Sequence, residues 1–202
     1  MSQHPLFQQL VDDGTVVILR GLTPDEAIGV GEALVRAGIR FMEVPLNRPG
    51  ALEAIRLLAG RFAGQADVHV GAGTVLTPEQ VDSVRQAGGE FIISPNTRQA
   101  VIRRTRELEL LSMPGFATPT EAFDAIDAGA DLLKVFPYGT PENIAVLKSV
   151  IPLPVFAVGG VTRENRRELL SVADGVGVGI GIYRPGMTPA EVHLSAKEFL
   201  EA

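Results

Sequence analysis

Cysteine is absent from the 202 residues of this chain. The fold therefore uses no disulfides, and no metal site can use thiolate ligands. Nothing in the composition requires an oxidising compartment, so we expect a reducing cytoplasm. Aromatic residues make up only 5% of the sequence, which favours a core of Val, Ile, Leu and Ala over an aromatic-rich sandwich.

Long apolar runs and an excess of positive charge are also missing. No segment offers the roughly 18 consecutive apolar residues of a membrane span, and residues 1–13 lack the pattern of a signal peptide. We therefore expect no contact with a membrane. The net charge is −6, and Lys and Arg form no cluster with interleaved aromatics, which disfavours nucleic acid as a partner. A small anionic substrate would need locally placed cations or backbone amides.

Regular helix signals punctuate the chain. Thr is a preferred N-cap, Pro suits the first helical position, and Glu or Gln three residues after the Thr completes a capping box. Ala-Gly pairs at 37–38, 87–88 and 128–129 predict helix ends, because Gly readily adopts the left-handed conformation of a C-cap. Thr-Pro pairs predict helix starts after Thr23, Thr77, Thr118, Thr140 and Thr188, of which only Thr140 lacks the Glu or Gln.

Eight short apolar runs lie between these signals, and each is continuous, as in parallel strands buried on both faces. The apolar runs alternate with helical stretches at a period of roughly 20 to 25 residues, which is typical of α/β folds. We therefore predict one (β/α)₈-barrel domain over residues 1–202. An open doubly wound sheet would need a glycine-rich fingerprint after its first strand, and residues 19–22 do not form one. The predicted strands are residues 16–19, 41–44, 68–70, 91–93, 110–113, 132–135, 155–158 and 176–178.

One lysine stands inside an apolar run. Lys134 interrupts residues 132–137, whereas Lys148 and Lys197 lie in predicted helices. In barrel enzymes the working residues lie at the carboxyl ends of the strands. Burial lowers the pKa of an amine and frees it to attack a carbonyl group, which is the chemistry of Schiff-base enzymes. The alternative is a structural ion pair, with Glu43 as the candidate partner.

Glu43 interrupts another apolar run, residues 41–45. Its carboxyl group could move protons during imine chemistry at Lys134, or it could pair with Lys134 and take no part in chemistry. Both interpretations predict that the two side chains lie close together.

Glycines follow the last two predicted strands, where barrels often bind phosphate through backbone amides. Gly159, Gly160 and the segment 177–181 could do so, or could simply form tight turns. Arg20 follows the first strand and could bind a carboxylate or phosphate, or pair with Asp25 or Glu26.

We expect no metal site. The three histidines, His4, His69 and His193, are scattered along the chain. Only His69 lies in a predicted strand, and its place at the strand's start puts it on the opposite rim from the other candidates, so we expect a structural role.

Several longer motifs follow one another along nearly the whole chain. They are residues 18–21 (Ile-Leu-Arg-Gly), 23–27 (Thr-Pro-Asp-Glu-Ala), 43–47 (Glu-Val-Pro-Leu-Asn), 71–76 (Gly-Ala-Gly-Thr-Val-Leu), 95–96 (Pro-Asn), 134–137 (Lys-Val-Phe-Pro) and 156–161 (Phe-Ala-Val-Gly-Gly-Val). In this order they resemble the 2-keto-3-deoxy-6-phosphogluconate and -6-phosphogalactonate aldolases.

The resemblance implies a class I aldolase that needs no metal or organic cofactor, with Lys134 as the Schiff-base lysine and Glu43 as the proton shuttle. It further implies a homotrimer whose partner is a small 2-keto sugar-acid phosphate. By resemblance, the pyruvate pocket would be shaped by Arg20, Thr74, Pro95 and Phe136, and the phosphate would be held by Gly159 and Gly160.

Two segments resemble the phosphogalactonate branch of this family. They are residues 45–47 (Pro-Leu-Asn) and 157–159 (Ala-Val-Gly). The phosphogluconate branch differs in both segments, since it usually has Thr and Arg at positions 45 and 47 and Thr at position 158. The expected reaction is cleavage of 2-dehydro-3-deoxy-6-phosphogalactonate to pyruvate and D-glyceraldehyde 3-phosphate. Three alternatives stay open: cleavage of phosphogluconate or 4-hydroxy-2-oxoglutarate substrates, cleavage of a non-phosphorylated 2-keto-3-deoxy sugar acid, and a barrel that binds phosphate ligands without turnover.

The sequence departs from the family where the phosphate would bind. The family usually has a Ser after the eighth strand, where this chain has Gly179-Ile180-Gly181, and the loop from Tyr138 to Pro141 is shorter and lacks a Ser. A side-chain donor is therefore lost. Either backbone amides, with Gly179 among them, hold the phosphate, or the substrate depends less on one.

Overall fold

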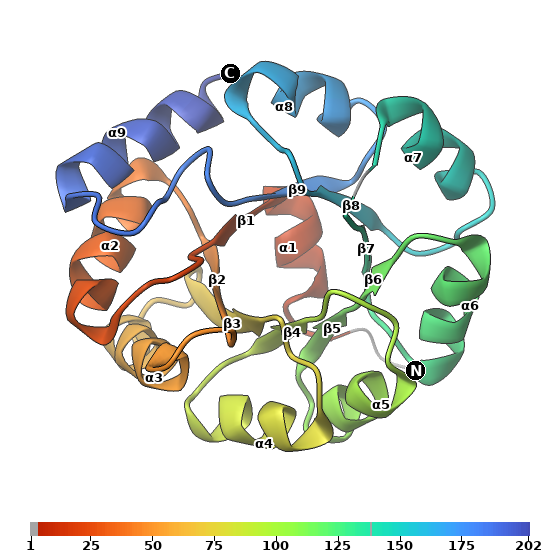
Figure 1. Cartoon of the computed structure of the whole chain (residues 1–202), viewed down its shortest axis with the longest axis horizontal. Helices are drawn as coiled ribbons and strands as arrows, with labels where there is room; N and C mark the ends of the chain where they lie inside the picture. Colours follow the sequence, from red (N-terminus) through yellow and green to blue (C-terminus); the bar gives the residue numbers. More distant parts are fainter. Residues whose placement is uncertain (1–3, 138) are drawn as a thin grey trace.

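The computed structural model describes residues 4–137 and 139–202. In these residues nine parallel strands form one sheet that curves into a barrel, and helices surround it, which confirms the predicted (β/α)₈ barrel (Figure 1). The strands are β1 Thr15–Ile18, β2 Phe41–Pro45, β3 His69–Gly73, β4 Phe91–Ile93, β5 Leu111–Met113, β6 Gly115–Phe116, β7 Leu133–Val135, β8 Val155–Val158 and β9 Gly175–Val178. The helices are α1 Phe7–Asp13, α2 Pro24–Ala37, α3 Ala51–Phe62, α4 Pro78–Gln86, α5 Gln99–Glu107, α6 Pro119–Ala128, α7 Pro141–Lys148, α8 Arg163–Leu170 and α9 Pro189–Leu200.

The fifth predicted strand continues further than expected and is split in two. β5 pairs with β4, β6 pairs with β7, and Pro114 lies between the two halves. Proline has no N–H to donate, which interrupts the ladder. The chain still closes the ring here, because the carbonyl of Pro114 accepts a hydrogen bond of 3.0 Å from the amide of Lys134.

The ends of several strands also differ from the prediction. β2 and β3 extend through Pro45 and Gly73, beyond the predicted ends at residues 44 and 70, so Gly71 lies within a strand instead of in the loop after it, while Glu43 lies within β2 as predicted. The sheet pairing explains the difference, because Glu43 lies opposite Gly71 and Pro45 opposite Gly73 in the parallel register.

Both faces of the strands are buried, as predicted, and successive side chains point to opposite faces. On β7, Leu133 and Val135 join the core between sheet and helices. Leu132 and Phe136 instead pack in the cluster inside the barrel. Because Lys134 lies two residues from each, its side chain also points into the barrel.

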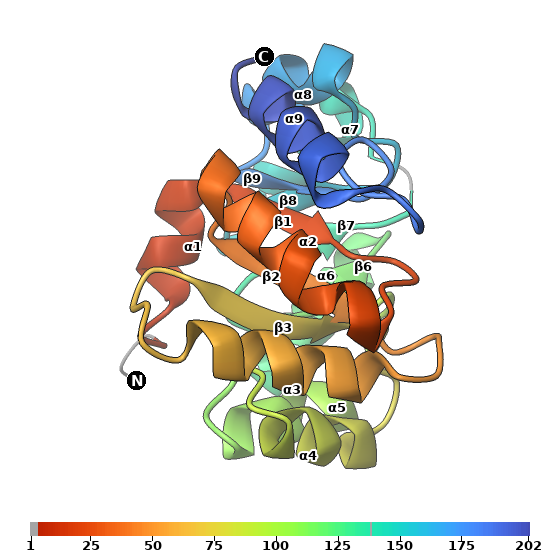
Figure 2. The same cartoon turned by 90° about the vertical axis from the view of Figure 1, so that its left-hand side faces the viewer.

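A short helix that the sequence analysis did not predict closes the amino-terminal end of the barrel. α1 lies across the barrel axis in Figure 1, and Figure 2 shows it at the end away from the loop that joins β1 to α2. Its Leu10 is fully buried and packs with Phe41, Phe91 and Phe156 inside the barrel. The helix has only seven residues, too few for the apolar spacing to reveal it.

The helix signals are confirmed. All five predicted threonines are N-caps, and the four predicted capping boxes form, whereas Thr140 caps α7 without one. Gly38 and Gly129 are left-handed C-caps. At α4 the prediction was one residue off, since Ala87 is the C-cap and Gly88 follows it with a φ of 89°.

Among the residues described, no helix is both long enough and apolar enough to cross a membrane.

We expect Leu10→Ala to lower the free energy of unfolding by about 2–5 kcal/mol, because it leaves a cavity where α1 meets the barrel interior. Urea denaturation followed by circular dichroism measures the change. Gln8→Ala, at an exposed position of the same helix, is the control. Equal losses in the two variants would show that α1 does not close the barrel core.

Candidate active site

A cavity of about 900 Å³ lies at the carboxyl-terminal end of the barrel. We call it the active-site cavity. Its lining includes all nine residues predicted for the site: Arg20, Glu43, Thr74, Pro95, Lys134, Phe136, Gly159, Gly160 and Gly179. The structure therefore places all nine around one cavity, and their individual roles stay predictions.

Lys134 projects from β7 at the base of this cavity, and only 5% of its surface is exposed. Its Nζ lies 4.9 Å from the centre of the Phe136 ring. Burial lowers the pKa of Lys134, the charge of Glu43 opposes this shift, and the charge of Arg20 adds to it. The amine is therefore more readily deprotonated than that of an ordinary lysine.

Glu43 faces the same cavity from β2, and only 3% of its surface is exposed. Burial raises the pKa of the Glu43 carboxyl, and the charges of Lys134 and Arg20 oppose the shift. Its Oε2 is buried without a hydrogen-bond partner in the described residues. The carboxyl group fits beside β3 because residue 73 is glycine, and a Cβ there would collide with it.

The amine and the carboxyl group do not form a short ion pair. Within residues 4–137 and 139–202, no nitrogen–oxygen contact of 4.0 Å or less joins Lys134 to Glu43. The predicted alternative of a structural ion pair is therefore not seen. Two buried groups whose pKa values shift toward their neutral forms can supply a nucleophile and an acid to one reacting molecule.

Arg20 contributes a positive charge to the same end of the cavity. Its charge influences both Lys134 and Glu43, and in the described part of the chain it forms no ion pair with Asp25 or Glu26. Glu26 instead accepts hydrogen bonds from Thr23 and from the amide of Gly186. Arg20 is therefore available for a carboxylate of a bound molecule.

The turn after β3 holds Thr74 in an unusual backbone conformation. Thr74 has a φ of 54°, which is uncommon for a residue with a side chain. The next residue is tied to the neighbouring strand, because the Ser94 hydroxyl donates a hydrogen bond of 2.9 Å to the carbonyl of Val75. Such conformations persist where the surrounding structure enforces them, and they cluster at functional sites.

Glycines form the wall of the cavity after β8. Gly159 has a φ of 108°, and a Cβ there would collide with the carbonyl of Pro137, while Gly160 has a φ of 66°. These values support the predicted tight turn, and the turn also exposes backbone to the cavity. Thr162 is the N-cap of α8, a helix start that the sequence analysis did not predict.

The loop after β9 forms the neighbouring wall. The carbonyl of Gly179 accepts hydrogen bonds of 2.9 Å from the amides of Ile182 and Tyr183, which closes a turn. Ile180 is 76% exposed and lines the cavity at the position where the family resemblance led us to expect a Ser. In the described chain, no hydrogen bond uses the amides of Gly160, Ile180 or Gly181, so these amides are free for an anion. Tyr138, part of the predicted short loop, lies outside the described residues.

Sequence reasoning missed several residues of this cavity. Arg163, Tyr183, Arg184 and Glu198 line it alongside the predicted set. Arg184 carried a usable signal, because it lies in the loop between the last strand and the last helix, which must also run along the active-site rim.

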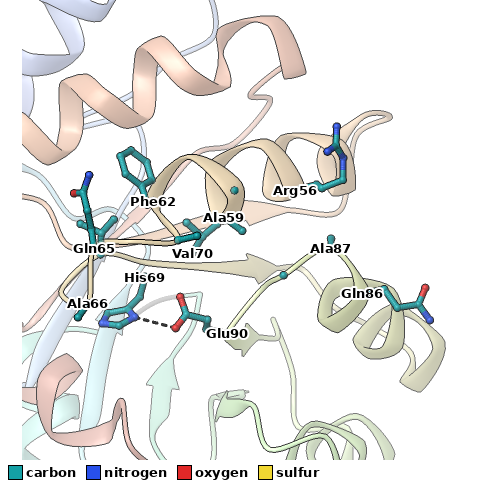
Figure 3. Close-up of a pocket in the computed structure, with 14 residues that line it drawn as sticks. Arg56, Ala59, Phe62, Gln65, Ala66, His69, Val70, Gln86, Ala87 and Glu90 are labelled. Carbon is teal, nitrogen blue, oxygen red and sulfur yellow. Dashed lines mark hydrogen bonds and ion pairs between the residues drawn. The ribbon is translucent and has the colours of Figure 1, made fainter.

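Another cavity shares no lining residue with the active-site cavity. It has a volume of about 630 Å³ and is lined mostly by α3, the start of β3 and the end of α4 (Figure 3). His69 lies here, with its Nδ1 3.1 Å from Glu90 and its Nε2 2.9 Å from Gln9. Both ring nitrogens therefore have partners, which fits the structural role predicted for His69.

Fold and cavity together define a class of protein: a (β/α)₈-barrel enzyme with a buried amine and carboxyl group placed for carbonyl chemistry. Residues 9–187 match the family model described as "KDPG and KHG aldolase". The chain belongs to this aldolase family and is a carbon–carbon lyase.

Individual relatives agree with this assignment. The chain is 41% identical, over 93% of its own length and 93% of the relative's, to 2-dehydro-3-deoxy-6-phosphogalactonate aldolase of Escherichia coli K12. It is 40% identical to a solved structure described as native KDPGal, with a TM-score of 0.89 and coverage of 93% and 92%. A porous protein cage designed by fusing symmetric oligomeric domains matches with the same identity and TM-score, over 93% of this chain and 71% of that one.

The electrostatics of the cavity predict how Lys134 titrates. We expect its reaction with trace acetic anhydride to rise with pH about a midpoint below the ordinary value for lysine, because burial disfavours the ammonium form. Glu43→Gln should move the midpoint further down, and Arg20→Met should move it up, since their charges act in opposite directions. Peptide mass spectrometry measures the labelling, with Lys197 as the reference for reagent decay. A midpoint at or above the ordinary value would contradict the prediction.

Proposed function

We propose that this protein is a class I aldolase that cleaves 2-dehydro-3-deoxy-6-phosphogalactonate to pyruvate and D-glyceraldehyde 3-phosphate. The observation that carries the proposal is the buried amine of Lys134, which faces the cavity without a short ion pair and has a lowered pKa. The phosphogalactonate aldolases among the relatives support the choice of substrate.

The first stage is formation of an imine at Lys134. The deprotonated amine attacks the C2 carbonyl carbon of the substrate, and the carbinolamine loses water to give a protonated imine. Glu43 protonates the departing hydroxyl group, a role that suits a carboxyl group whose pKa burial raises.

The second stage is cleavage of the C3–C4 bond. The Glu43 carboxylate accepts the proton of the C4 hydroxyl, the C4–O bond becomes the aldehyde carbonyl, and the C3–C4 electron pair moves toward the imine to form an enamine. Glu43 then returns the proton to C3, and water releases pyruvate from Lys134. The water lost on imine formation balances the water consumed here, and the iminium nitrogen is the electron sink, so the steps require no further cofactor.

The remaining cavity residues orient the substrate. Arg20 binds its carboxylate, since its charge acts on both Lys134 and Glu43 and it forms no ion pair within residues 4–137 and 139–202. Thr74, Pro95 and Phe136 enclose the pyruvate part, and the turns at Gly159, Gly160 and Gly179 present amides to the phosphate.

Val158 bears on which C4 configuration the enzyme accepts. Its side chain lines the cavity and cannot donate or accept a hydrogen bond. The phosphogluconate branch usually has Thr here, so the apolar residue favours the galacto substrate over the gluco substrate. The family description covers both KDPG and KHG aldolases, which makes these substrates the alternative.

We further propose that the whole chain acts as one barrel domain, that it works as a homotrimer in the cytoplasm, and that it binds neither nucleic acid nor membranes. The oligomeric domains of the similar designed cage support self-association, and the lack of cysteine suits a reducing compartment. Analytical ultracentrifugation tests the trimer, and a monomeric or dimeric species at working concentration would contradict it.

Borohydride trapping tests the imine. Incubation with pyruvate and borohydride should add the mass of a reduced pyruvate adduct to the peptide that contains Lys134, because reduction fixes the imine. Lys134→Ala should abolish both adduct and pyruvate release, and Lys148→Ala is the control. An unmodified Lys134, or full activity of Lys134→Ala, would refute the mechanism.

Glu43→Gln should still give the pyruvate adduct at Lys134, but more slowly, and should lower kcat about 10²- to 10⁴-fold, the usual contribution of a proton-transferring side chain. Pyruvate release, followed with a coupled dehydrogenase, measures kcat. Unchanged turnover would limit Glu43 to a structural role.

Comparison of the two epimers tests the substrate. We expect kcat/KM for the galacto substrate to exceed that for the gluco substrate by at least about 10-fold. Val158→Thr should narrow this difference. Equal values for the two epimers in the unaltered protein would favour the broader family activity.

A further inference from the structure

One arginine of the active-site cavity has no role so far. Arg184 lies in the loop between β9 and α9, lines the cavity and is exposed. In the described residues its guanidinium forms no ion pair. By contrast, Arg163, which lines the same cavity, has its charge compensated by Glu198 at 3.2 Å.

Whereas Lys134 lines the cavity from β7, Arg184 lines it from the loop after β9. It follows directly on the turn formed by Gly179 and Tyr183, next to the free amides of Ile180 and Gly181. The charge of Arg20 acts on the pKa values of Lys134 and Glu43. In the described residues the cavity lining thus holds two arginines without an ion pair, Arg20 after β1 and Arg184 after β9.

The loop that carries Arg184 is tied to the start of α2. The amide of Gly186 donates a hydrogen bond of 3.2 Å to Oε1 of Glu26, while Oε2 of Glu26 accepts from the hydroxyl of Thr23 at 2.7 Å. Burial and the neighbouring charge of Glu26 raise the pKa of Tyr183 to about 12. Figure 2 shows the loop before α9 passing beside α2.

Glu26 is a capping-box glutamate like Glu121 and Glu191, but in the described structure it alone of the three has a side-chain carboxylate that also binds another loop. The Glu121 carboxylate accepts only from the amides of Ala117 and Thr118 and the Thr118 hydroxyl, while its backbone carbonyl accepts from Thr97. Glu191 likewise binds only Thr188. The link from Glu26 to Gly186 is therefore additional to helix capping.

We propose that Arg184 binds the terminal phosphate of the substrate, and that Glu26 is a positioning residue that holds the loop of Arg184 against α2. This inference rests on the proposed function. A guanidinium group can donate two parallel hydrogen bonds to a phosphate, which neither a lone amide nor a hydroxyl group can do. The side-chain donor lost at Ile180 is thus replaced by a cation four residues further along the same loop.

Arg184→Met tests the binding role. We expect KM for the phosphorylated substrate to rise on the order of 10- to 100-fold, the usual weight of a charge-assisted hydrogen bond, with a much smaller change in kcat. Inhibition by inorganic phosphate should weaken in parallel. Arg103→Met, which removes an exposed charge on α5, is the matched control and should change neither value.

Borohydride trapping of pyruvate separates this inference from the proposed function, because pyruvate carries no phosphate. Arg184→Met should be trapped at Lys134 as readily as the unaltered protein. An unchanged KM, or a loss of trapping in this variant, would overturn the assignment of Arg184. Failure of trapping in the unaltered protein would instead refute the proposed function itself.

Glu26→Gln tests the positioning role, with Glu121→Gln as a matched capping-box variant. Both should lower thermal stability slightly, since each removes a negative charge from the first turn of a helix. Only Glu26→Gln should raise KM for the phosphorylated substrate, by a smaller factor than Arg184→Met, and pyruvate trapping should stay intact. Equal KM values in the two glutamine variants would overturn the role of Glu26.

Discussion

The structure depends on enclosing an amine and a carboxyl group inside a barrel without joining them in a short ion pair. Each group is nearly inaccessible, and burial shifts the pKa of each toward its neutral form. Such an arrangement lowers stability, because desolvation of ionisable groups is unfavourable. The apolar barrel interior below them, closed by Leu10 of α1, supplies the compensating burial.

Space for this pair comes from small residues on neighbouring strands. Gly73 leaves room for the Glu43 carboxyl group, and Gly71 leaves room for the ring of Phe91. Bulky side chains from one strand thus fill positions left open by glycines on the next, which is how small barrels pack their interiors. The same alternation of large and small side chains therefore packs the barrel interior and leaves room for Glu43 beside the cavity.

The wall of the active-site cavity carries two groups of polar residues. Lys134 and Glu43 are buried, where desolvation strengthens their electrostatic effects, and the charge of the exposed Arg20 acts on both. Glycine turns and the loop before α9 line the cavity as well, with free amides and the exposed Arg184. If Arg184 binds the phosphate as proposed, the loop that has Ile180 in place of the expected Ser still supplies a side-chain donor.

The sequence by itself determined the alternation of helices and strands, the helix caps and the identity of the two charged residues in apolar strands, because these depend on local propensity and periodicity. Positions in or after strands, together with the family motifs, then identified the nine cavity residues. Only the tertiary structure decided that Lys134 and Glu43 share a cavity without a short ion pair, that Pro114 splits a strand, and that Glu26 accepts a hydrogen bond from Gly186 in the loop of Arg184. These features join residues that are far apart in the chain, so no local pattern records them.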